Sequence, residues 1–147
     1  MIQEKQVLAV AKSLIKKNKI NCDIKLLNYK KFKSLAKKSP LIFQVLKEGF
    51  TFRELNLPAV IYHKKTDHIF ICKEILEKLL KKQPKNSQKK FIEAIVLHEI
   101  FHIKNRKNVS KFELNESINS EENVFNKFKK SYPKLFRLSS KIINSKK

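Results

Sequence analysis

Cysteine is scarce in this sequence. The two residues, Cys22 and Cys72, each lie in an apolar, strand-like run, and no Cys-x-x-Cys spacing occurs. We favour two buried thiols, while a single bridge between them stays open. Because hydrophobic residues make up 41% of the 147 residues, the chain can form one ordinary core without disulfides or a structural metal. A metal ion would therefore serve chemistry more than stability.

Long hydrophobic runs are also missing. No segment approaches the roughly 18 uninterrupted apolar residues of a membrane-spanning helix. At the N-terminus, acidic and amide residues precede the apolar stretch and Lys12 interrupts it. This pattern is typical of an amphipathic helix and not of a secretory signal. We therefore expect a soluble, intracellular, cytoplasmic protein.

Acidic residues are few, 13 against 34 Lys and Arg, which gives a net charge of +21. Nucleic acid, an anionic membrane surface and acidic proteins are all compatible partners for such a charge. The codon bias of an AT-rich genome is the competing explanation, because lysine pairs are scattered from end to end and Asn and Ile are frequent. Arginine, which reads bases and phosphates by paired hydrogen bonds, is rare. Sequence-specific DNA recognition is therefore the less favoured form of any nucleic-acid role.

Hydrophobic periodicity predicts an alternation of helices and short strands. The only glycine, Gly49, is placed to end a helix, and Ser39-Pro40 is placed to split the same helix. Two β-branched and aromatic runs separated by four residues predict a hairpin. The expected elements are helices at 2–19, 32–48, 73–82, 87–105, from about 120, and from 133, with strands at 22–29, 59–63 and 68–72.

No repeat, linker or break in composition divides the chain. We therefore expect one domain over 1–147. It would comprise N-terminal helices and a strand over 1–57, the hairpin and two functional helices over 58–130, and a C-terminal helix and tail over 131–147. The fold class expected is α+β, with a small, mostly antiparallel sheet beside a pair of metal-binding helices.

Residues 98–102 read His-Glu-Ile-Phe-His, an HExxH motif. On a helix, His98 and His102 project from one face, so both imidazoles can bind one zinc ion. Glu99 is displaced around the helix, which puts its carboxylate beside the metal. That is the position of a general base for water activated by the metal.

Context supports this motif, which arises by chance in about one chain per hundred of this composition. It lies in a strongly helical, mostly apolar segment, where Phe91, Ala94 and Ile95 precede His98 on its own face. The competing interpretation makes His98 and His102 hydrogen-bonded core histidines. We favour the metal site, because polar residues in so apolar a helix need a reason.

A catalytic zinc site usually takes a third protein ligand and leaves its fourth position to water. Glu122 lies on the next functional helix, four residues before Asn126, so one can ligate while the other orients a ligand histidine. Glu121 is the neighbouring alternative, and we favour Glu122 because its spacing matches Asn126. A solvated first turn of a helix would also explain the two glutamates. Glu113 and Glu116 are weaker candidates without a clear helical frame.

An HExxH helix followed by a helix with Glu-x-x-x-Asn resembles the gluzincin branch of zinc metallopeptidases. The short gap before Glu122 and the run Glu122-Asn-Val-Phe-Asn-Lys-Phe128 are similar to the ImmA/IrrE-like family. The resemblance covers residues 58–130. Phe101 stands where that family usually has glycine, and Phe125 where it usually has alanine.

The resemblance implies a zincin-like fold and zinc-dependent endopeptidase activity, in some members against DNA-bound repressors. Glu99 would then accept a proton from the attacking water and pass it to the leaving amine. The oxyanion-stabilising side chain stays open among Tyr62, His63, His68 and Tyr132. Substrate would lie extended along a strand of the 59–72 hairpin.

Two further functions stay open. One is a basic nucleic-acid-binding protein with a zincin-like fold and little or no turnover. The other is a toxin or effector protease aimed at another cell. A SprT-like protease, which acts on DNA-bound proteins, is less favoured because no histidine follows His102. The oligomeric state is not indicated by any pattern.

Overall fold

The computed structural model describes residues 3–36, 58–64, 66–106 and 118–144; within these ranges the side chains of residues 36, 60–64, 105–106 and 118–123 are not described. The described chain is mostly helical. Along it lie α1 (Glu4–Lys17), β1 (Cys22–Leu27), α2 (Tyr29–Ala36), β2 (Ala59–Lys64), β3 (Thr66–Cys72), α5 (Lys73–Leu80), α6 (Lys85–Arg106), α7 (Ile118–Ser131) and α8 (Pro133–Asn144). The described elements match the expected ones to within a few residues, except that the helix expected at 32–48 can be compared with α2 only as far as residue 36. The predicted break at Ser39-Pro40 and the predicted cap at Gly49 lie outside the described residues.

The three strands form one mixed sheet in the order β1-β3-β2. β2 and β3 pair antiparallel, with Tyr62 opposite His68, as the hairpin pattern predicts. β1 pairs with β3 in parallel, with Ile24 opposite Ile69. The expected zincin-like fold with a mostly antiparallel sheet is therefore wrong. A hairpin pattern specifies only neighbouring strands, and residues 28–58 are long enough for the crossover that a parallel pairing needs.

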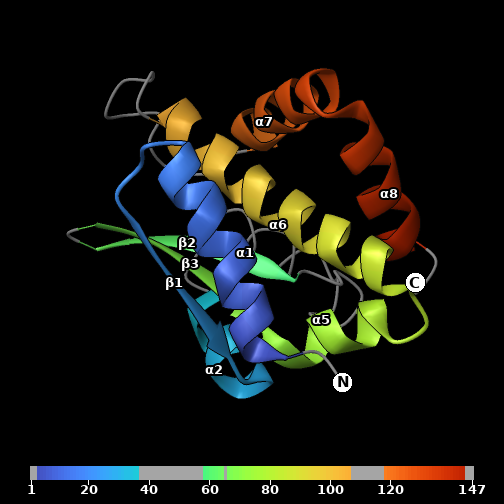
Figure 1. Ribbon diagram of the computed structural model, residues 1–147. Coiled ribbons are helices and arrows are strands. Elements are labelled where there is room, and N and C mark those ends of the chain that lie inside the picture. The colour runs from blue at the N-terminus through green and yellow to red at the C-terminus, as the bar shows by residue number, and fades with distance from the viewer. Residues whose placement is uncertain (1–2, 37–57, 65, 107–117, 145–147) are drawn as a thin grey trace.

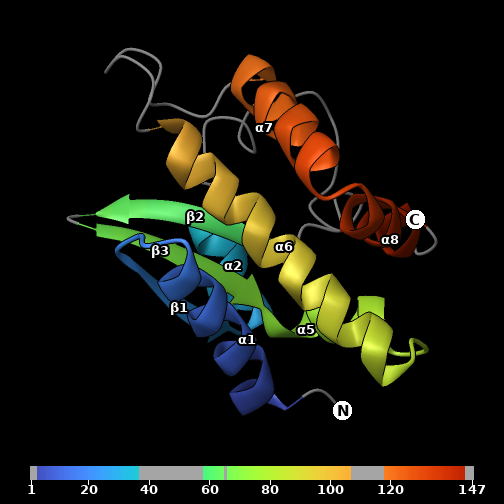
Figure 2. The same ribbon diagram turned by 45° about the horizontal axis from the view of Figure 1, so that its top comes forward.

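Helices cover both faces of this sheet. α1 and α6 pack side by side on one face, and α2 lies on the other (Figure 2). Burial alternates along β3, where Asp67, Ile69 and Ile71 are buried and the residues between them are partly exposed. Period-two burial is what a strand with one deeply buried face shows. α6 therefore packs on one face of the sheet, against β2 and β3.

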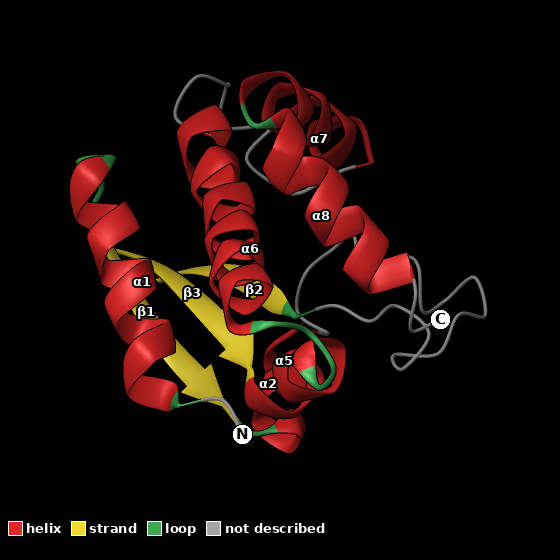
Figure 3. Cartoon of the chain, turned by 45° about the vertical axis from the view of Figure 1, so that its right-hand side comes forward, coloured by secondary structure: helices red, strands yellow, loops and turns green. Residues whose placement is uncertain are grey.

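α6 is the central helix of the described chain. α1 and the sheet lie on one side of it, and α7 and α8 lie on the other (Figure 3). Buried residues surround it on all sides, so the helix lacks a solvent-facing stripe over most of its length. Near its C-terminus, Lys104 Nζ donates a hydrogen bond to Asn18 Oδ1 at 2.7 Å, and Asn18 Nδ2 donates to Leu14 O at 2.8 Å. These bonds join the end of α1 to the part of α6 that carries the HExxH motif.

Cys22 and Cys72 form no disulfide. Cys22 pairs with Asp67 at one end of the parallel ladder, and Cys72 pairs with Leu27 at the other. Five residues of strand separate the two positions, or about 17 Å, far beyond the reach of a bridge. Within the described ranges, the helices are too short or too polar to cross a bilayer.

Candidate metal centre

His98, Glu99 and His102 lie in the C-terminal half of α6. Because a helix turns about 100° per residue, the two histidines face one side, and the fully buried Val96 and Ile100 face roughly the opposite side. The aliphatic side packs against α1 and the sheet, which fixes the rotation of the helix. The histidine side is thereby turned toward α7 and α8.

The two histidine rings lie close together, with centroids 5.0 Å apart and planes tilted by 36°. His102 is 6% exposed, whereas His98 is half-buried. A donor pair of this kind fits zinc, which takes imidazole nitrogen at about 2.0–2.1 Å. The paired rings therefore offer two ligands from one rigid helix.

Glu99 is buried, with 9% of its surface exposed. Its position on the helix is displaced by about 60° from that of His102. A carboxylate held out of water is costly unless charged or polar groups stabilise it. The sequence analysis proposed Glu99 as a general base, and the structure buries this residue on the helix that carries the two histidines.

α7 covers the histidine face. The ring of His98 lies 5.9 Å from that of Phe128 and 6.3 Å from that of Phe125, centroid to centroid. Phe128 is 1% exposed and Val124 is fully buried, so both anchor α7. The second helix of the predicted pair therefore packs on α6, with ring contacts to His98.

The predicted third ligand, Glu122, lies on α7, but its side chain and that of Glu121 are outside the described residues. The helix backbone locates both positions relative to the ring contacts. Position 121 lies within about 40° of both Phe125 and Phe128 around α7, whereas position 122 lies about 60° and 120° away from them. Both positions are one to two turns from rings that contact His98. The choice between the two glutamates that the sequence left open stays open here.

Asn126, the predicted orienting residue, is exposed on α7 next to Phe125. Among the described residues, no group of three His, Cys, Asp or Glu side chains is close enough to hold a metal ion. The two glutamates offered as third ligand stand outside that search, because their side chains are not described. His98, Glu99 and His102 are therefore the candidate site residues whose side chains the structure describes.

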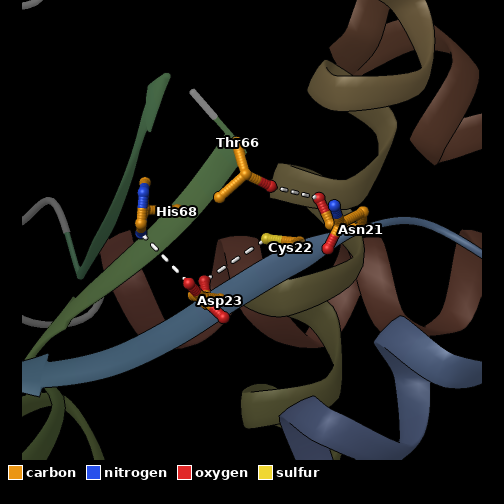
Figure 4. Close-up of polar contacts among 5 residues, drawn as sticks. All are labelled: Asn21, Cys22, Asp23, Thr66 and His68. Atoms are coloured by element: carbon orange, nitrogen blue, oxygen red, sulfur yellow. Dashed lines mark hydrogen bonds and ion pairs between the residues drawn. The ribbon is translucent and has the colours of Figure 1, made fainter. Parts of the chain in front are cut away.

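Two of the four candidates for oxyanion stabilisation can be located. His68 lies on β3, 3.8 Å from the Asp23 carboxylate on β1 (Figure 4). Its ring is stacked on that of Phe70, with the centroids 5.8 Å apart. Tyr132 lies at the end of α7, with its ring 6.0 Å from that of Phe128. Tyr132 therefore shares an aromatic neighbour with His98, and His68 has its contacts within the sheet. The side chains of Tyr62 and His63 are outside the described residues.

Aromatic rings behind the histidines form a feature that the sequence analysis did not identify. The rings of α6, α7 and α8 touch in a chain of contacts between 4.6 and 6.2 Å. We call this group the aromatic cluster: Phe101, Phe125, Phe128, Tyr132 and Phe136. The spacing of three or four residues between its α7 and α8 members could have signalled a shared face. Its contact with His98 depends on the packing of α7 on α6, which no local pattern shows.

Comparison with protein-family models, with curated proteins and with solved structures found no match for this chain.

Proposed function

We propose that this protein is a zinc-dependent endopeptidase. The observation that carries the proposal is the pair of imidazoles, 5.0 Å apart on one face of α6, beside the buried carboxylate of Glu99. Likeness to ImmA/IrrE-like metallopeptidases, drawn from the motifs, adds support and is itself part of the proposal. An intracellular location belongs to it as well, in keeping with two cysteines that form no disulfide.

Each residue has a defined role in this proposal. His98 and His102 hold the ion, with Glu122, or its neighbour Glu121, as the third ligand. When bound, zinc supplies a Lewis acid that polarises the peptide carbonyl and lowers the pKa of water toward about 7. Glu99 accepts the proton of the attacking water and delivers it to the leaving amine. Burial of the carboxylate keeps bulk water from competing for that proton.

The aromatic surroundings of His98 also fit this role. Phe128 and Phe125 contact the imidazole ring and limit its rotation, so the nitrogens keep one direction. Ligands that are held in place lose less entropy when the ion binds. Asn126 is proposed to orient a ligand from the same helix.

The test combines metal content with peptide hydrolysis in the wild type, His98→Ala and Glu99→Gln. We expect about one zinc per wild-type chain, a loss of zinc in His98→Ala, and full zinc content in Glu99→Gln. Glu99→Gln should retain the shape of the site and lose roughly 10²- to 10⁴-fold in kcat/KM, because its amide cannot accept the proton. A wild type that takes up no zinc, or a Glu99→Gln variant as active as the wild type, would refute the proposal.

The net charge of +21 favours a second candidate, a basic nucleic-acid-binding protein. The two functions separate in one measurement, the binding of a labelled oligonucleotide over a range of salt concentrations. Salt-dependent binding that is unchanged in Glu99→Gln, together with no hydrolysis by the wild type, would favour the binding protein. Hydrolysis that Glu99→Gln abolishes favours the peptidase.

A further inference from the structure

Two members of the aromatic cluster reach the surface. Phe125 is 41% exposed and Tyr132 is 39% exposed, and they are the large hydrophobic side chains that stand out as exposed among the described residues. Phe128, which contacts Tyr132, is 1% exposed, and the ring of Phe136 contacts both Phe128 and Phe125. Exposed rings that rest on a packed layer form a firm apolar surface, and such surfaces mark places of contact.

Phe125 connects this surface to the proposed metal centre. On one side, its ring contacts the ring of His98, with the centroids 6.3 Å apart and the ring planes at 67°. On another side, it contacts the ring of Phe136 on α8, 4.6 Å away at 79°. The exposed ring is therefore held from both sides and lies next to a proposed zinc ligand. A group that packs on Phe125 would lie close to the reacting peptide bond.

Residues 124–144 of α7 and α8 carry a concentrated positive charge, whereas Glu121 and Glu122 lie near the start of α7. Residues 124–144 contain no Asp or Glu. Lys129 Nζ lies 5.7 Å from the centre of the Phe136 ring, so a positive charge lies at the aromatic cluster itself. The basic residues of this segment are all exposed: Lys127, Lys129, Lys130, Lys134, Arg137 and Lys141.

We propose that Phe125 and Tyr132 form a binding subsite for a large apolar side chain of a protein substrate, and that the surrounding lysines select acidic residues beside it. The subsite rests on the proposed peptidase function and names its substrate class. An exposed or extended segment that combines a Leu, Phe or Met with nearby Asp or Glu fits both features. Apolar contact supplies binding energy and the charges supply selection and a faster encounter.

Other occupants fit less well. A second copy of this chain would bring the same basic helices together at a net charge of +21 each, which opposes association. Nucleic acid would use the charge and leave the apolar rings unexplained. A bilayer needs side chains that project freely, whereas Phe125 is clamped between His98 and Phe136. A peptide uses the rings, the charge and the nearby histidine together.

The first measurement is peptide binding to Glu99→Gln, which needs no turnover. Three labelled peptides of equal length are compared by fluorescence anisotropy. One carries Phe flanked by Asp and Glu, one carries Phe flanked by Asn and Gln, and one carries Ala flanked by Asp and Glu. We expect the first to bind about ten-fold or more tightly than either of the others. Equal affinity for all three would overturn the subsite.

Variants then assign the two parts. Phe125→Ala, added to Glu99→Gln, should lower the affinity for both Phe peptides and leave the Ala peptide unchanged. Phe125→Leu keeps an apolar surface and should retain most of the affinity, which separates lost contact from lost folding. The triple variant K127Q/K129Q/K130Q should remove the preference for acidic flanks and flatten the salt dependence. A matched triple, K81Q/K82Q/K85Q, changes exposed lysines between the end of α5 and the start of α6, and it should change neither the preference for acidic flanks nor the salt dependence.

Remaining outcomes are also decisive. If both triples weaken binding equally, the general charge of the protein selects acidic peptides and the local assignment is wrong. Vesicles containing phosphatidylserine provide a further test. If they bind the wild type, do not bind Phe125→Ala, and are not displaced by any of the peptides, the surface is a membrane contact. Zinc-dependent hydrolysis by the wild type that is indifferent to Phe125→Ala would leave the peptidase standing and the subsite refuted. Selective peptide binding without zinc uptake would refute the peptidase and retain the surface.

Discussion

The two sides of α6 differ in kind. Val96, Ile100 and Ile103, each fully buried, give one side its aliphatic side chains, and the buried Glu99 lies at the border of that side, about 40° from Ile103. His98 and Phe101 lie on the opposite side, among aromatic rings from α7 and α8. The first side stabilises the fold through aliphatic packing, whereas the second brings the ring of His98 into contact with aromatic rings. The two sides of α6 therefore have different roles, because one stabilises the fold and the other carries the proposed site.

The largest effect that we predict is on zinc binding at the histidine side of α6. Loss of the true third ligand, by Glu122→Ala or Glu121→Ala, should weaken zinc affinity by more than about a hundred-fold, because removal of an outer partner alone costs 10- to 100-fold. The other variant should bind zinc like the wild type. Competition with a fluorescent chelator measures both. Comparable zinc affinity in the two variants and the wild type would exclude α7 as the source of a ligand.

On the aliphatic side, Ile100→Ala should affect stability. Removal of a fully buried isoleucine leaves a cavity and lowers the free energy of unfolding by about 2–5 kcal/mol. Urea denaturation of the zinc-free protein measures this loss without a contribution from the metal. The folded variant should keep its zinc affinity within a few-fold.

Phe101→Leu is the matched change on the other side of the helix. Phe101 is only partly buried, so this near-isosteric change should cost under about 1.5 kcal/mol. If Ile100→Ala lowered the free energy of zinc binding by more than it lowered the free energy of unfolding, the aliphatic side would also determine zinc affinity. The two sides of the helix would then not have separate roles.

The smallest effect concerns the two thiols. Burial raises the pKa of the Cys72 thiol, and the nearby Glu74 carboxylate raises it further, although backbone N–H groups at Ile75 and Glu74 oppose the shift. The folded state therefore holds this proton more tightly than the unfolded state does. Its contribution to stability is complete below the unfolded pKa of about 8.5 and is lost as the pH rises through the higher folded value.

A thiol reagent at pH 8 should accordingly modify Cys22, which is partly exposed, many-fold faster than Cys72. Mass spectrometry of Cys22→Ala and Cys72→Ala identifies which thiol reacts. Equal rates in the two variants would show that the end of β3 opens readily to solvent.

Local sequence patterns predicted most of the helices and strands, and they predicted that the HExxH motif lies on a helix. The spacing of His98, Glu99 and His102 was readable because helix geometry is fixed by residues three and four apart. The hairpin of β2 and β3 was readable for a similar reason, since its strands are neighbours in the chain. The parallel pairing of β1 was missed, because strand direction across residues 28–58 depends on which helices cover the sheet.

By itself, the sequence determined that one apolar helix carries two imidazoles and a carboxylate, and that the chain is strongly basic. Tertiary structure alone decided that α7 folds back on α6 across residues 107–117 and brings Phe125 and Phe128 to His98. It also decided that Lys129 of α7 lies over the ring of Phe136, which contacts the exposed Phe125. Periodicity is local and survives in the sequence, whereas contacts between distant helices depend on the packing of the whole core.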